Sequence, residues 1–207
     1  METVAVIDFE TTGMSPDAGA RATEIAAVLL RDGRVIDRYQ GLMNAGAYVP
    51  PFIEQLTGIS NAMVRAAPPA AKVMREVADF VGAHPLVAHN ASFDCRFWDA
   101  ELARIGRRRV QAFACTMLLA RRIYPEAPNH KLGTLVEFAG LPVAGRHHRA
   151  MADAEMAASL LARLERELER RFGLAPVTHE MLREMQSSPR HAMPGCIVRH
   201  GGRARAV

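Results

Sequence analysis

The stretch that decides the fold is residues 3–13, which read TVAVIDFETTG. Residues 3–8 are β-branched and apolar, and they predict a strand. Asp8 and Glu10 come where this strand ends, just before a Thr-Thr-Gly loop. Because side chains alternate along a strand, residues two apart share a face, and both carboxylates are expected on one side of the sheet. Two anions this close need a cation between them, and carboxylate oxygens suit Mg²⁺ or Mn²⁺.

Two more strands are expected soon after the first. Residues 24–30 and 34–40 have strand character, and the Asp32-Gly33 pair between them is typical of a hairpin turn. A stretch of loop and short helix then runs between the Pro50-Pro51 and Pro68-Pro69 pairs. The first third of the chain is therefore expected to be a three-stranded meander.

Helices alternate with a further strand in the rest of the chain. Residues 85–89 are expected to form a short buried strand, and Ser92 is the expected N-cap of the helix that follows it. The order of strands and helices predicts an α/β domain with a mixed central sheet flanked by helices. Helical spacing of apolar residues, or a helix boundary signal, marks the ranges 70–82, 92–105, 115–123, 131–139 and 150–172.

Composition limits the class of protein. The 207 residues are 49% hydrophobic, which is enough for one folded domain and excludes a wholly disordered chain. We expect a domain over residues 1–173 and a C-terminal extension over 174–207, with a short helix at 178–187 and a polar, basic tail. The sequence contains no run of about 18 apolar residues, so it predicts no membrane span. The start lacks the pattern of a signal peptide, and three scattered cysteines lack a C-x-x-C pair, so we expect a cytoplasmic protein.

The charge permits an acidic partner without identifying one. The formal net charge is +4, and 24 of the 26 basic residues are Arg. Arginine suits bidentate phosphate recognition, but a GC-rich codon bias produces the same composition. The Arg107–Arg109 run has the same two interpretations, since it either follows a phosphate backbone or lies in a solvated loop.

Further acids stand at the starts of two predicted helices. Residues 89–94 read HNASFD and place Asp94 in a first helical turn, while His148 precedes Asp153 at the start of the helix over 150–172. Each pattern is common by itself: D-x-E occurs three times and H-x4-D twice, and acids are favoured in first turns. The order of the three patterns along the chain is more specific than any one of them.

As an ordered set, these motifs resemble the DEDDh family of 3′–5′ exonucleases, which includes the epsilon proofreading subunit of bacterial DNA polymerase III. His148 lies five residues before Asp153, as in the histidine branch, whereas Arg149 stands where the related branch has a tyrosine. The resemblance covers about residues 3–170. The matching segments read DFETTG (8–13), HNASFD (89–94) and HRAMADA (148–154), with softer matches at TGIS (57–60) and HKLGTL (130–135).

The resemblance implies a ribonuclease-H-like fold and a set of roles. His148 would take a proton from the attacking water, since imidazole is largely neutral near pH 7. Phe9, Thr11 and Phe93 would lie near the terminal nucleotide, although core packing is an equally good explanation for both phenylalanines. The acids that would hold two Mg²⁺ or Mn²⁺ ions are Asp8, Glu10, Asp94 and Asp153.

The expected function is a metal-dependent 3′–5′ exonuclease that releases 5′-mononucleotides from DNA, in proofreading or repair. Its expected partner is a single-stranded 3′ end, with DNA favoured over RNA, and a DNA polymerase is a further candidate. One alternative is an RNA-trimming exoribonuclease of the ribonuclease T or oligoribonuclease type. Another is a non-catalytic module that binds a polymerase or nucleic acid. The oligomeric state and the role of residues 174–207 stay open.

Overall fold

The computed structural model describes residues 2–142 and 148–203. One five-stranded sheet has the order β3-β2-β1-β4-β5. The pairs β1–β2 and β2–β3 are antiparallel, and the pairs β1–β4 and β4–β5 are parallel, so the expected mixed sheet is confirmed. The strands are β1 (Thr3–Thr11), β2 (Ala22–Arg31), β3 (Arg34–Leu42), β4 (Leu86–Ala88) and β5 (Phe113–Cys115).

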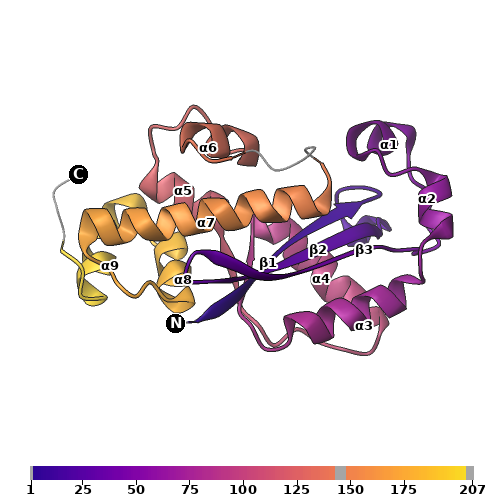
Figure 1. The fold of residues 1–207 in the computed structure, drawn as a ribbon, viewed down its shortest axis with the longest axis horizontal. Coiled ribbons are helices and arrows are strands. Elements are labelled where there is room, and N and C mark those ends of the chain that lie inside the picture. The colour runs from indigo at the N-terminus through magenta and orange to yellow at the C-terminus, as the bar shows by residue number, and fades with distance from the viewer. Residues whose placement is uncertain (1, 143–147, 204–207) are drawn as a thin grey trace.

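Helices cover both faces of the sheet. The longest, α7 (Ala150–Phe172), runs along one face, and α3 (Ala70–Val81) and α4 (Ala91–Arg104) lie on the other (Figure 1). Helices α1 and α2 lie at the end of the molecule where α7 begins, and α8 and α9 lie at the opposite end (Figure 1). The remaining elements are η1 (Pro16–Ala18), α1 (Pro51–Thr57), α2 (Asn61–Ala66), α5 (Thr116–Ile123), α6 (Leu132–Phe138), α8 (His179–Ser187), η2 (Arg190–Ala192) and α9 (Met193–Arg199).

The central strand β1 has its apolar residues buried on both faces. Val4 and Val6 pack into the hydrophobic cluster that contains α7. Ile7 and Phe9 belong to the cluster that contains α3 and α4. Because side chains alternate along a strand, the even-numbered residues of β1 face α7. The register of β1 therefore decides which face its two acids share.

The hairpin and the last long helix form as the sequence predicts. Asp32 and Gly33 have φ angles of 54° and 69°, which suit a tight turn between β2 and β3. Helix α7 ends at Phe172, and Gly173 follows it with φ 69°, the left-handed C-cap that glycine adopts most readily.

Three local features differ from the sequence predictions. Strand β1 runs on to Thr11, because its pairing with β2 continues past Asp8 to a register shift after Glu10. Ser92 is not the N-cap of α4; Asn90 holds that place with φ 65°. Strand β5 was not predicted, because its three residues, unlike those of the equally short β4, include no β-branched residue.

The C-terminal segment contains one helix more than the sequence indicated. The expected helix over 178–187 is α8, and the predicted tail includes α9. Met193, Cys196 and Ile197 of α9 are buried in the same cluster as α7. Pro194 and Gly195 hide this helix from a propensity argument, but proline is tolerated in a first helical turn.

Across residues 2–142 and 148–203, no helix combines the length and the apolar character that crossing a bilayer requires. Helix α7 has 23 residues, but its polar face carries a series of charged side chains.

Helix α7 should contribute much of the stability of the fold. Leu160 on α7 is fully buried, so Leu160→Ala is expected to lower the free energy of unfolding by about 2–5 kcal/mol through lost burial and a residual cavity. Urea denaturation measures this, with the m-value expected to stay unchanged. Glu169→Ala on the exposed side of the same helix is the matched control. Equal stability losses for the two variants would contradict the packing described above.

Candidate active site

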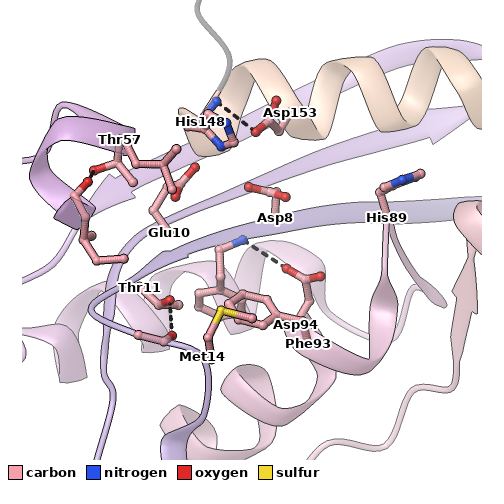
Figure 2. Close-up of a pocket in the computed structure, with 14 residues that line it drawn as sticks. Asp8, Glu10, Thr11, Met14, Thr57, His89, Phe93, Asp94, His148 and Asp153 are labelled. Carbon is pink, nitrogen blue, oxygen red and sulfur yellow. Dashed lines mark hydrogen bonds between the residues drawn. The ribbon is translucent and has the colours of Figure 1, made fainter. Parts of the chain in front are cut away.

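Four carboxylates converge on one pocket. Asp8, Glu10, Asp94 and Asp153 line a cavity of about 190 Å³ together with His148, and Figure 2 shows the acids arranged around a common space. All five residues singled out in the sequence as candidates for metal binding and proton transfer thus lie in the same pocket. Its other lining residues are Phe9, Thr11, Gly13, Met14, Ile53, Leu56, Thr57, His89 and Phe93.

Each acid reaches the pocket from the end of an element. Asp8 and Glu10 are even-numbered residues of β1 and share the face that packs on α7. Asp94 and Asp153 lie in the first turns of α4 and α7. The spacing of two residues in β1 and the two helix starts are the features that the sequence predicted.

Backbone hydrogen bonds fix two of these carboxylates. The Phe9 amide donates to Asp94 Oδ1 over 3.1 Å, which ties the start of α4 to β1. The His148 amide donates to Asp153 Oδ2 over 3.1 Å, which folds the residue before α7 onto its first turn (Figure 2). The pocket therefore has little freedom to relieve its charge by moving these groups apart.

Burial raises the pKa values of three carboxylates in the pocket, and neighbouring acids add to the shift for two of them. Burial raises the pKa of Glu10 to about 8, and the nearby charges of Asp153, Glu24 and Asp94 add to the shift. Burial raises the pKa of Asp94 to about 7, against hydrogen bonds from the backbone that lower it. The pKa of Asp8 is also well above its usual value, first because of desolvation and then because of its acidic neighbours. Such a site gains stability when a cation enters it.

The donor set fits a hard divalent cation. One oxygen each of Glu10 and Asp153 and a ring nitrogen of His148 lie within 4.8 Å of one another. Carboxylate oxygens are the ligands that Mg²⁺ and Mn²⁺ prefer. Burial and the neighbouring carboxylates raise the pKa values of Asp8 and Glu10, so a cation beside them would stabilise their ionised forms.

The two histidines of the pocket have different environments. His89 is held through both ring nitrogens, by Thr116 Oγ1 at 2.9 Å and by the His130 carbonyl at 3.0 Å. Burial lowers the pKa of His89 to about 4, so its ring stays neutral. His148 is exposed and lies beside the acids. Of the two H-x4-D patterns in the sequence, the one at His148 therefore has the histidine that is open to solvent beside the acids.

The three candidate substrate-binding residues line the pocket to different extents. Phe9 is 4% exposed, and its ring packs against the rings of Phe97 and Trp98. Phe93 is half-buried, with its ring 4.9 Å from that of Phe97. The Thr11 hydroxyl donates to the Gly13 carbonyl over 2.7 Å. Core packing thus accounts for much of Phe9, while Phe93 offers a ring surface to the pocket.

Sequence reasoning missed an ion pair that anchors the start of α7. Arg149 binds the fully buried Glu24 of β2 through two hydrogen bonds of 3.1 and 2.8 Å. The Ala150 amide donates to the same carboxylate over 3.1 Å. The available signal was an acid inside an otherwise apolar strand, because buried acids are seldom left unpaired.

Sequence reasoning also missed the apolar wall of the pocket. Met14 follows the β1 loop and is 75% exposed, while Ile53 and Leu56 come from α1. The sequence showed this region only as a loop and a short helix. Exposed apolar side chains beside a polar cavity are typical of a surface that binds a ligand.

Two arginines of the Arg107–Arg109 run form ion pairs outside the carboxylate pocket. Arg107 pairs with Asp79 over 2.6 Å, and Arg109 pairs with Asp99 over 2.7 Å. None of the three arginines lines the carboxylate pocket. These contacts favour the solvated-loop interpretation.

Comparison with protein families and curated sequences gives consistent matches. The RNase T family, described as exonuclease, matches residues 5–161. The PolC-type DNA polymerase III of Bacillus cereus is 35% identical over 164 residues, which are 79% of this chain and 11% of that protein. The 3′–5′ exonuclease DinG of Bacillus subtilis is 40% identical over 158 residues, which are 73% of this chain and 16% of that protein. The chain therefore spans less than a fifth of the length of these relatives.

A solved structure matches along most of its length. Exonuclease X, solved in complex with 5′ overhanging duplex DNA, superposes with a TM-score of 0.70 and 26% sequence identity. The match covers 89% of this chain and 99% of that one.

The metal-free protein should become less stable as the pH rises. Glu10 and Asp94 have raised pKa values, so the folded state keeps protons that the unfolded chain releases at lower pH. The stability from these groups is thus lost as the pH climbs from about 5 to about 8. Thermal denaturation in EDTA across this range measures the effect, and Glu10→Gln should flatten it. A melting temperature that rises with pH in the wild type would contradict the assigned charges.

Proposed function

The chain belongs to the RNase T family of DEDD 3′–5′ exonucleases, and we propose that it removes mononucleotides from the 3′ end of single-stranded DNA. The observation that carries the proposal is the convergence of four carboxylates and an exposed histidine in one pocket beside an apolar wall. The names of its relatives, a DNA polymerase III, a 3′–5′ exonuclease and an exonuclease bound to DNA, support DNA as the substrate.

The acids of the pocket would hold two divalent ions, Mg²⁺ or Mn²⁺, as DEDD exonucleases generally use. Bound there, the ions supply charge stabilisation for the attacking and leaving oxygens and lower the pKa of water. The carboxylates that would hold them are Asp8, Glu10, Asp94 and Asp153. The raised pKa values of Asp8 and Glu10 support the proposal, since a bound cation would stabilise their ionised forms.

His148 would act as the general base. It accepts a proton from the attacking water, whose oxygen forms a bond to the terminal phosphorus. The bond from phosphorus to the 3′ oxygen of the preceding nucleotide breaks, that oxygen takes up a proton, and a 5′-mononucleotide leaves. Because His148 is exposed, it can return its proton to solvent before the next cycle.

The rest of the pocket would hold the terminal nucleotide. Phe93 provides a half-buried ring for stacking, a contact worth about 1–3 kcal/mol per base. Met14 and Leu56 would contact the other side of the base or the sugar. Thr11 and the pocket-facing edge of Phe9 complete the floor. A base held by such contacts is recognised by its flat shape, so binding does not depend on which base it is.

Glu24 and Arg149 would position the general base. His148 has φ 61°, a left-handed conformation that costs a non-glycine residue roughly 1–2 kcal/mol. The neighbouring Arg149 is fixed by Glu24, and Ala150 is held by the same carboxylate. These contacts fix the backbone that follows His148. They help to hold His148 in its unfavourable conformation, with its ring directed at the pocket.

A role in proofreading or repair, with a DNA polymerase as a candidate partner, is supported by the match to the PolC-type polymerases. An RNA-trimming activity is the alternative, because the carboxylates and His148 contact the phosphate and do not distinguish the sugars. Recognition of the 2′-hydroxyl separates the two substrates.

Digestion of matched 5′-labelled single-stranded DNA and RNA tests the substrate. We expect a ladder that shortens from the 3′ end of DNA with Mg²⁺ or Mn²⁺ and is abolished by EDTA. His148→Ala should lower the rate about 10²–10⁴-fold, as expected for loss of a general base. His191→Ala, an exposed histidine outside the pocket, is the control. Faster degradation of RNA than of DNA would favour the RNA-trimming alternative, and an unimpaired His148→Ala would remove His148 from the mechanism.

A double-mutant cycle tests the positioning pair. Glu24→Gln and Arg149→Met should each lower kcat about 10–100-fold with little change in KM, because a small displacement of His148 slows proton transfer. The double variant should be no slower than either single variant, since both remove one interaction. Arg38→Ala, which breaks the exposed ion pair with Glu155 of α7, is the control. Additive losses would show that the two residues act separately.

A further inference from the structure

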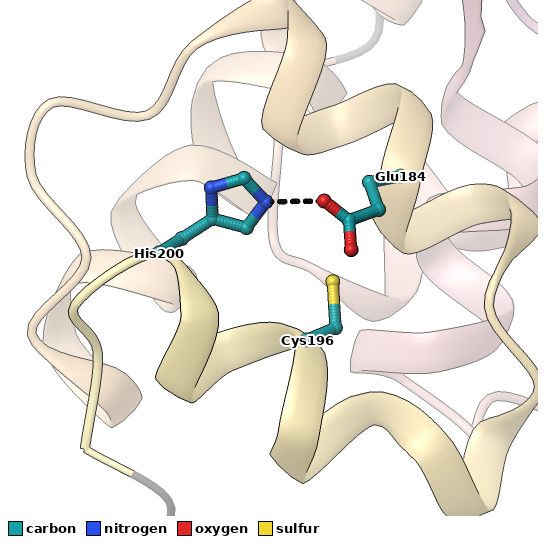
Figure 3. Close-up of side chains that lie close together, drawn as sticks. All are labelled: Glu184, Cys196 and His200. Carbon is teal, nitrogen blue, oxygen red and sulfur yellow. Dashed lines mark hydrogen bonds and ion pairs between the residues drawn. The ribbon is translucent and has the colours of Figure 1, made fainter.

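Three side chains with metal-binding groups meet between α8 and α9, far from the carboxylate pocket. Glu184 comes from α8, Cys196 from α9, and His200 directly follows α9. Figure 3 shows the imidazole and the thiol both directed at the carboxylate. His200 Nε2 lies 2.7 Å from Glu184 Oε2, and one ligand atom of each residue lies within 4.8 Å of the other two.

The fold holds these groups in place without a metal. Cys196 and His200 are four residues apart, so one helical turn brings them to the same side of α9. Cys196 is fully buried, and its neighbours Met193 and Ile197 pack into the main hydrophobic cluster. Glu184 and His200 are 37% and 22% exposed, so the cluster opens to solvent on one side. The thiol is therefore rigid, and an ion has a route to it.

We propose that Glu184, Cys196 and His200 form a zinc site that fastens α9 to α8. A sulfur, an imidazole nitrogen and a carboxylate oxygen are the ligands that Zn²⁺ takes, whereas Mg²⁺ and Ca²⁺ take oxygen alone. Tetrahedral Zn²⁺ with bonds of about 2.0–2.3 Å places its ligand atoms about 3.3–3.8 Å apart. These distances lie between the 2.7 Å contact of His200 with Glu184 and the 4.8 Å that encloses all three ligand atoms. Binding releases the thiol proton of Cys196 to solvent, and water takes the fourth position.

Arg199 is the competitor for this site. Its Nε donates to Glu184 Oε1 over 3.0 Å, and its Nη2 contacts the same oxygen. The Arg199 side chain is 60% exposed, so it can turn into solvent without uncovering the core. An ion would replace Arg199 as the partner of the Glu184 carboxylate. Removing the arginine should then strengthen metal binding, which a purely structural ion-pair cluster does not predict.

The site would be structural and not catalytic. Helix α8 is joined to the edge of the sheet, because Gln186 accepts from the Cys115 amide over 2.6 Å and donates to the Phe113 carbonyl over 3.2 Å. An ion between α8 and α9 thus connects the C-terminal segment to β5. It lies at the end of the molecule opposite the start of α7 (Figure 1).

Titration of the whole protein with Co²⁺ tests the proposal. Co²⁺ replaces Zn²⁺ in such sites, and only a thiolate ligand gives an intense charge-transfer band in the near ultraviolet. The carboxylate pocket has no cysteine among its lining residues, so Co²⁺ bound there is silent in this band. With excess Mg²⁺ present to occupy the carboxylate pocket, we expect the band to saturate at one equivalent of Co²⁺, and Zn²⁺ to abolish it and raise the melting temperature.

Variants separate this site from other thiols. Cys196→Ser should abolish the band, and His200→Ala should weaken Co²⁺ binding at least tenfold. Cys95→Ser should retain the band. Arg199→Gln should tighten binding. The exonuclease rate in Mg²⁺ should be unchanged in Cys196→Ser. The proposal is overturned if the folded wild-type protein gives no band, or if the band survives in Cys196→Ser. The wild-type result decides even where a variant fails to fold.

Discussion

The mutual repulsion of buried carboxylates is the constraint on which the rest of the structure depends. Burial raises the pKa values of Asp8, Glu10 and Asp94, and neighbouring carboxylates add to the shift for the first two, so the pocket itself opposes folding. The stabilising free energy that offsets this cost comes from β1, whose apolar residues are almost completely buried on both faces of the sheet. A strand covered on both sides cannot shift register to separate its acids, because a shift of one residue would turn its apolar side chains to the wrong faces. The hydrophobic core thereby keeps in place the charge cluster that the proposed cations would neutralise.

The ion pair of Glu24 with Arg149 is the counterpart of this repulsion. Glu24 raises the pKa of Glu10, and Arg149 lowers it, so the pair adds little net charge beside the pocket. A buried pair of this kind contributes little net stability, because desolvation offsets its attraction. Its geometry is what matters, since one carboxylate binds both the Arg149 side chain and the Ala150 amide. The start of α7 is thus located by a directional contact, which apolar packing along the helix does not provide.

The sequence predicted those parts of the molecule whose signal is local. The alternation in β1, the turn at Asp32-Gly33 and the end of α7 before Gly173 each follow from a few neighbouring residues. The order of the acidic motifs predicted the composition of the pocket, although no single motif did. Features fixed by distant contacts were missed, because Glu24 meets Arg149 across 125 positions and α9 forms by burying one face on the main core. Ser92 is a good N-cap by type, but α4 starts earlier because Asn90 adopts the left-handed turn after β4.

The carboxylates and the apolar wall of the pocket are supported by different hydrophobic clusters. The carboxylates are fixed by the two large clusters on either side of the sheet. Two residues of the apolar wall are carried by α1, whose Ile53 belongs to a small separate cluster with Val49, Ile59 and Val64. A small cluster costs less free energy to rearrange than a large one, so the wall can adapt to the proposed nucleotide while the carboxylates stay fixed. Acids that repel one another require a rigid frame, whereas a surface that accepts any base requires an adaptable one. The division of the apolar residues into separate clusters meets both requirements within one chain.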